Sequence, residues 1–107
     1  MATRYFFYSI YDTATSAYMR PFIAPQDAQA IRLFKDIALD ADHDVGKHPE
    51  DYSLFRLGIF DEGKGKILGE APDCLVTALE LVAQARQVNQ DKIHELETEI
   101  TQARRTQ

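Results

Sequence analysis

The sequence predicts an α+β fold in the order ββα-ββα, with a four-stranded antiparallel sheet that carries helices on one face. Three observations support this: runs of aromatic and β-branched residues end at turn residues, two segments have helical periodicity, and the second of these continues as a heptad pattern. The chain has 107 residues, the size of one ordinary domain. We expect a globular α+β domain over residues 1–85 and a helical coiled-coil extension over residues 86–107.

In the first half, aromatic and β-branched residues predict a strand over residues 4–11. Both of its alternating faces are apolar, which is typical of a strand covered on both sides. Small polar residues predict a turn over 12–16, and a second strand over 17–23 follows, which Pro21 places at a sheet edge. Pro25 at a first helical position and Asp27 in the first turn predict a helix over 25–39.

In the second half, residues 52–60 form the clearest strand pattern, and residues 61–65 form a turn into a short return strand over 66–69. Pro72 is then expected to open a helix over 72–104. The side chains expected to be buried are Phe7, Ile31, Phe34, Phe55, Leu57 and Ile59.

The last helix carries a heptad repeat. Its a positions are Leu79, Arg86, Ile93 and Ile100, and its d positions are Leu75, Val82, Asn89, Leu96 and Ala103. Isoleucine at a with leucine at d favours a parallel two-stranded coiled coil. In that arrangement Lys92 attracts Glu97 and Glu99 attracts Arg104 of the other chain.

We therefore expect a homodimer through the C-terminal helix. The residues expected at its seam are Leu79, Val82, Asn89, Ile93, Leu96 and Ile100. The alternative is a single amphipathic helix packed on its own sheet, which we expect of residues 75–82. Beyond residue 86 the helix would outrun so small a core, so its apolar side chains need a partner.

Composition excludes several classes of protein. Twelve Lys and Arg against 17 Asp and Glu give a net charge of −5, which argues against a surface that grips nucleic acid throughout. The single cysteine, Cys74, makes no internal disulfide and indicates a reducing compartment. No apolar run is long enough to span a membrane. No phosphate loop or nucleophile motif is present, so we expect no enzymatic activity and no cofactor.

Two features allow other chemistry. Cys74, at the start of the expected helix, is either an acidified thiol or a small buried filler, and the second is favoured. In segment 40–51, Asp40, Asp42 and Asp44 imitate the start of a calcium loop, but Val45 stands where the loop needs glycine. His43 and His48 with these carboxylates are an alternative transition-metal set, and a solvated loop without metal is favoured.

The aromatic strands also permit single-stranded nucleic-acid binding, in which bases stack on rings between basic residues. The alternative is that the rings fill the core or a dimer interface. The candidate DNA-contacting residues are Arg4, Tyr8, Arg20, Arg56, Lys64 and Lys66.

Residues 46–61 carry a family resemblance. They read Gly-Lys-His-Pro-Glu-Asp-Tyr, then an alternating strand with a glycine, then Phe-Asp before the turn with Gly63. This pattern, with residues 9–12, 21–22 and 30–34, resembles the small nonstructural protein of gokushoviruses, single-stranded-DNA bacteriophages of the Microviridae. The resemblance covers about residues 4–72.

The resemblance implies a protein that is absent from the virion and acts in the host bacterial cytoplasm, as a counterpart of the factor that switches replication to DNA packaging. Two hypotheses follow. The first is a dimeric adaptor in packaging or replication control, with phage replication or procapsid proteins as partners. The second is a single-stranded-DNA-binding protein that uses the aromatic and basic hairpins.

Overall fold

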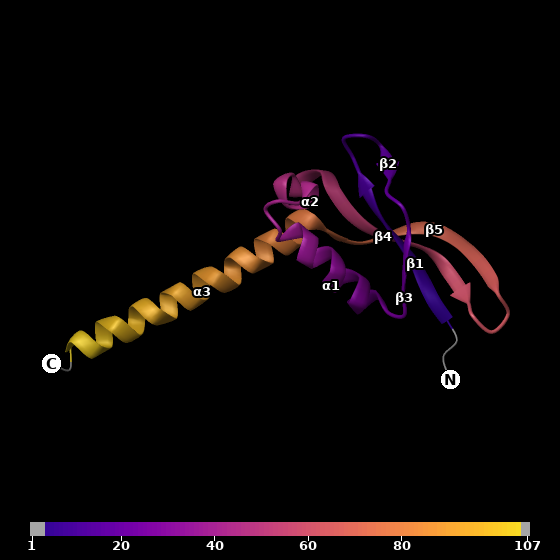
Figure 1. The fold of residues 1–107 in the computed structure, drawn as a ribbon. Helices are drawn as coiled ribbons and strands as arrows, with labels where there is room; N and C mark the ends of the chain where they lie inside the picture. Colours follow the sequence, from indigo (N-terminus) through magenta and orange to yellow (C-terminus); the bar gives the residue numbers. More distant parts are fainter. Residues whose placement is uncertain (1–3, 106–107) are drawn as a thin grey trace.

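A computed structural model describes residues 4–105, with side chains up to residue 100. A curled sheet and two short helical segments form a globular unit, from which one long helix projects (Figure 1). The elements in chain order are β1 Arg4–Asp12, β2 Ala17–Tyr18, β3 Phe22–Ala24, α1 Asp27–Ala38, α2 Asp44–Lys47, the 3-10 turn η1 Pro49–Asp51, β4 Tyr52–Asp61, β5 Lys66–Thr77 and α3 Ala78–Arg105.

The sheet is antiparallel, as expected. Its order is β2-β1-β4-β5, and β3 pairs with β1 along the same edge as β2. The expected second strand is therefore two short strands, and the sheet has five strands rather than four. Residues 19–21 interrupt it, because Pro21 has no N–H for the ladder. The Ser9 hydroxyl holds this break against β1 by donating to the Met19 carbonyl at 2.6 Å.

The core lies between the helices and one face of the sheet. Tyr8, Ile10 and Leu54 from β1 and β4 pack against α1, and the first turn of α3 and the α2 segment complete the cluster. The α1 and α3 side chains in it include Ala30, Phe34, Ala38, Ala78 and Leu81. The other face of β1 contributes nothing to this cluster, and its Phe7 and Tyr11 are only half-buried although Ser9 there is fully buried, so the expectation that β1 is covered on both sides is met only in part.

The expected buried set is corrected in the same way. Phe34 is buried, as predicted, with 1% of its surface exposed. Five others are only half-buried, because they lie on the opposite face of the sheet or at the margins of the core: Phe7, Ile31, Phe55, Leu57 and Ile59.

The last helix begins later than the sequence predicts. Strand β5 continues past Pro72 to Thr77, and Asp73 and Cys74 pair with Arg56 and Phe55 of β4. An irregularity in the β4–β5 register accommodates residues 70–72, so the proline is tolerated in an edge strand. Leu75, expected at a d position, therefore lies in a strand. Helix α1 likewise begins at Asp27 rather than Pro25.

Thr77 explains the start of α3. Its Oγ1 accepts a hydrogen bond from the Glu80 backbone N–H at 3.1 Å, the interaction of an N-cap residue with the third helical position. From there α3 runs for 28 residues, about 42 Å at 1.5 Å per residue. All side chains of residues 86–100 are exposed. The radius of gyration is 19.2 Å, against about 13 Å for a compact chain of 100 residues.

Candidate interaction surfaces

Two of the DNA candidates, the buried Tyr8 and the half-buried Arg56, belong to one polar cluster around Asp27. The Tyr8 hydroxyl donates to Asp27 Oδ1 at 2.7 Å, and Arg56 Nη1 forms an ion pair with Asp27 Oδ2 at 3.2 Å. The Arg56 guanidinium also lies 5.1 Å from the centroid of the Phe6 ring. Burial, and then the hydrogen bond to Asp27, raise the pKa of the Tyr8 hydroxyl well above its usual value. The cluster joins the start of α1 to β1 and β4.

Tyr8 therefore does not suit the stacking role that the sequence suggested. None of its surface is exposed, so a base would reach the ring only if α1 moved off the sheet. Its ring instead stacks on Phe22 of β3, with centroids 5.6 Å apart. The sequence does not show which face of β1 the helices cover, so it does not distinguish the buried Tyr8 from a surface residue.

The other basic candidates are exposed but do not form one patch. Arg4 pairs in register with Asp61, which also pairs with Lys66 and accepts a hydrogen bond from the Lys64 backbone N–H at 3.1 Å. These three basic residues therefore gather at one end of the sheet around an acidic residue. Arg20 lies apart, in the break between β2 and β3.

The sheet face turned away from the helices carries an aromatic cluster of Tyr11, Tyr18 and Phe55. The ring centroids of Tyr11 and Tyr18 are 4.7 Å apart, and Phe55 lies edge-on to both at 6.0 and 5.6 Å. Tyr18 is 43% exposed. We call these three residues the outer aromatic cluster. Aromatic residues on both alternating faces of β1 in the sequence are the signal that a second apolar face exists.

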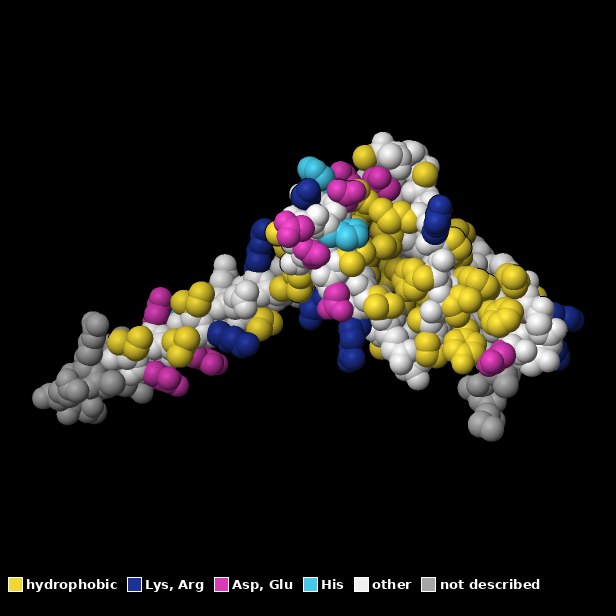
Figure 2. Space-filling model, viewed as in Figure 1, with side chains coloured by type: hydrophobic (Ala, Val, Ile, Leu, Met, Phe, Trp, Pro, Cys, Tyr) yellow, Lys and Arg dark blue, Asp and Glu magenta, His cyan; other side chains and the backbone are white. Residues whose placement is uncertain are grey.

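Helix α3 carries two apolar stripes. Ala78, Leu81 and Ala85 recur at helical spacing and face the globular unit, where the first two are buried. The heptad residues lie about a quarter turn away, and four of them are more than half exposed: Leu79, Ile93, Leu96 and Ile100. Figure 2 shows hydrophobic side chains gathered over the sheet beside α1 and spaced along α3. The spacing of the first stripe could have identified it in the sequence.

A groove of about 550 Å³ adjoins the heptad stripe. One wall is α3 itself, and the other is the end of α1 with the segment that follows it. The side of α3 contributes Leu79, Val82, Ala85, Arg86 and Asn89, and the opposite wall includes Ala41, Lys47 and Pro49. We call this the α3 groove. No sequence pattern predicts its second wall, which folding brings from residues 38–50.

The acidic segment forms a helical turn rather than a calcium loop. Asp40 accepts the Asp42 backbone N–H at 2.9 Å, and His43 Nδ1 accepts that of Val45 at 3.1 Å at the start of α2. The buried Val45 anchors the turn to the core. These contacts place the three aspartates that imitate a calcium loop in a locally hydrogen-bonded turn.

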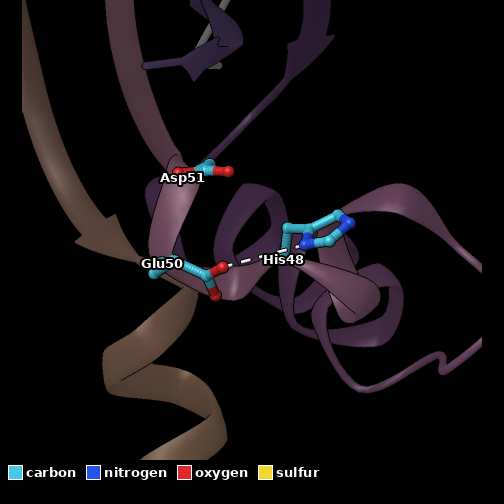
Figure 3. A group of neighbouring side chains, drawn as sticks. All are labelled: His48, Glu50 and Asp51. Atoms are coloured by element: carbon cyan, nitrogen blue, oxygen red, sulfur yellow. Dashed lines mark ion pairs between the residues drawn. The ribbon is translucent and has the colours of Figure 1, made fainter. Parts of the chain in front are cut away.

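His48, Glu50 and Asp51 form a small polar group beside α2 and η1 (Figure 3). The His48 Nδ1 lies 3.7 Å from Glu50 Oε1, and potential ligand atoms of all three lie within 4.8 Å of one another. No other group of three such residues converges in the described chain. The His48 and Glu50 side chains are largely exposed, 63% and 58%.

Cys74 lies in β5 rather than at a helix start, and it is exposed rather than a buried filler. Loss of solvent around its sulfur, followed by the nearby charges of Glu80 and Asp73, raises the pKa of the thiol. The position therefore does not supply an acidified nucleophile.

These surfaces define the class of protein: a small α+β protein with an uncovered amphipathic helix and an aromatic sheet face. Among residues 4–105, no helix is both long and apolar enough to cross a bilayer. The chain matches the family described as phage ORF5 protein over residues 5–81 and belongs to that family. No curated protein and no solved structure matches it.

Proposed function

We propose that the chain is a non-enzymatic, dimeric adaptor that acts in phage DNA packaging or replication switching in the host cytoplasm. The observation that carries the proposal is the heptad stripe on the projecting part of α3. Ile93, Leu96 and Ile100 are 55%, 58% and 53% exposed, and no part of the described chain covers them. Apolar side chains repeated at this spacing are typical of a coiled-coil seam.

Membership of a phage protein family supports a role in phage infection. The resemblance of residues 46–61 to the gokushovirus nonstructural protein supports the more specific role in DNA packaging or replication switching. A dimer with two globular units at the ends of its helices is suited to join two larger assemblies. Replication proteins and the procapsid are the partners that this role requires. Of the two expected charge pairs, Lys92 and Glu97 are exposed as the coiled coil requires. In the other pair Glu99 is exposed, and the side chain of Arg104 lies outside the described residues.

The proposal is tested in cells infected by the phage, with the gene replaced by a Leu96→Asp/Ile100→Asp variant. We expect double-stranded replicative DNA to accumulate while packaged single-stranded DNA is lost. A His94→Asp/Thr98→Asp variant adds the same charges on the opposite side of α3 and is expected to package normally. Normal packaging by the first variant, with its dimer confirmed as broken, would remove the adaptor proposal.

Single-stranded-DNA binding is the second candidate, and the outer aromatic cluster favours it. Tyr18 presents a partly exposed ring beside Phe55, and Arg20 follows two residues later. A base stacked on an aromatic ring contributes about 1–3 kcal/mol, so Tyr18→Ala is expected to weaken binding roughly 5–150-fold.

The measurement is fluorescence anisotropy of a labelled oligonucleotide across a salt series. Direct phosphate contact gives affinity that falls steeply with salt. Tyr8→Phe is the control, because this buried ring does not reach the surface. No binding of the unmodified protein at low salt would exclude this candidate and leave the adaptor.

A further inference from the structure

The α3 groove and the heptad stripe form one continuous surface. Leu79, Val82 and Asn89 of the stripe line the groove, and Ile93 and the residues beyond it continue the stripe where the groove ends. Packed helices lie only 8–10 Å apart between their axes. A second helix laid on the stripe at the level of the groove therefore also contacts the opposite wall.

The position of that wall distinguishes the two possible directions of the second helix. Ala85, at a g position, lines the groove, so the wall formed by residues 38–50 stands on the g side of α3. In a parallel coiled coil, g positions of one helix face e positions of the other, whereas in an antiparallel one they face g positions. The exposed Ala83 and Gln90 occupy e positions. In a parallel pair they face the wall of the other subunit, and twofold symmetry makes both contacts equal.

The residues that flank the heptad stripe are of a different type beside the groove and beyond its end. Beside the groove they include the exposed Ala83 and the half-buried Ala85, whose small side chains let a second helix approach both walls closely. Beyond it they include Lys92, Glu97 and Glu99, which suit a coiled coil surrounded by water. The change from small to charged residues thus coincides with the loss of the second wall.

We propose that the groove is the seat of α3 from a second copy of this chain, in parallel orientation. The partner helix then lies between α3 and residues 38–50, and its Ala83 edge packs toward Ala41 and Pro49. The inference rests on the proposed dimer and adds a second contact outside the coiled coil, which the parallel direction places against the Ala83 edge of the partner helix. Both globular units consequently lie at the same end of the helix pair.

The first test changes the wall and leaves α3 intact. Ala41 is exposed, so Ala41→Glu places a carboxylate in the groove without disturbing the core. Sedimentation equilibrium is expected to show a dimer dissociation constant raised on the order of a hundredfold, because the longer side chain occupies the space of the partner helix once in each subunit. Ala28→Glu, an exposed alanine near the other end of α1, is the matched control and is expected to leave the constant unchanged.

The outcomes separate this inference from the proposed dimer. A monomeric unmodified protein would overturn both. A dimer that Leu96→Asp/Ile100→Asp breaks, but that Ala41→Glu leaves as tight as before, would overturn the groove contact alone.

The second test determines whether the two α3 helices are parallel or antiparallel. In a Cys74→Ser background, Val82→Cys puts one cysteine at a seam position beside the groove. Mild oxidation is expected to yield a covalent dimer, because equivalent d positions meet in a parallel coiled coil. In an antiparallel pair centred on Ile93 and Leu96, the two residues lie far apart. A sample that is dimeric by sedimentation but forms no covalent dimer would refute the parallel direction.

Discussion

Replacing Leu96 and Ile100 by aspartate is the sharpest perturbation of the projecting helix. Full burial of one such side chain contributes about 1.5–3 kcal/mol. Leu96 and Ile100 are 58% and 53% exposed in the single chain, so dimerisation buries the remaining half and contributes about 0.8–1.5 kcal/mol at each. With two residues in each of two subunits, the variant forfeits about 3–6 kcal/mol, or roughly 10²–10⁴ in the dissociation constant. Four carboxylates at the seam add to this loss.

Light scattering coupled to size-exclusion chromatography measures the mass of the unmodified and variant proteins across concentration. We expect a dimer that becomes a monomer in the variant, with the sheet signal in the circular dichroism spectrum retained. The His94→Asp/Thr98→Asp variant is expected to remain dimeric, which excludes a general effect of negative charge on the helix. If the unmodified protein is a monomer at high micromolar concentration, or the aspartate variant stays dimeric, the coiled coil is not the assembly device.

Two further predictions concern the globular unit. Gly58→Ala is expected to destabilise it by about 1–3 kcal/mol in urea denaturation, because the new Cβ meets the backbone carbonyl of Leu68, whereas Gly69→Ala, which meets nothing within 4 Å, is expected to be nearly neutral; equal losses would refute this. Stability is also expected to fall as the pH rises above about 10, because unfolded Tyr8 loses its proton there while the folded residue, with its raised pKa, keeps it. Tyr8→Phe should cost about 0.5–1.5 kcal/mol at neutral pH and flatten that slope, and an unchanged slope would show that the Tyr8 hydroxyl is not the group responsible.

The sequence predicted the strands, α1 and the antiparallel class because their signals are local. Alternating aromatic residues in β1 and β4, and the stripe that contains Ala30 and Phe34 in α1, reflect each element's own periodicity. The turn after Asp61 also follows from neighbouring residues: Asp61 accepts the Lys64 N–H within it.

The errors arise where distant pairing decides the structure. Pro72 looked like a helix start, yet β4 extends the sheet past it by pairing with Cys74 and Asp73. Tyr8 looked like a surface ring, yet the position of Asp27 on α1 places it in the core. Neither contact can be read from spacing, because each joins residues 17 or more positions apart.

The candidate surfaces also differ in whether they depend on one element or on contacts between distant segments. The heptad on α3 was visible because it depends on one helix, although its first expected member, Leu75, belongs to the strand before it. The α3 groove was not visible, because its second wall comes from residues 38–50 and its position depends on Val45 packing into the core.

The junction between β5 and α3 has a mechanical consequence. Thr77 pairs with Ser53 in the sheet and also caps the first turn of α3, so no loop separates strand from helix. The junction is therefore rigid, and the sheet sets the direction of the α3 axis. Two chains joined along their helices would hold their outer aromatic clusters at a constant spacing and angle. A ligand long enough to contact both aromatic clusters would bind at that fixed spacing and angle. A glycine insertion after Thr77 would make the junction flexible, and the spacing and angle would then vary.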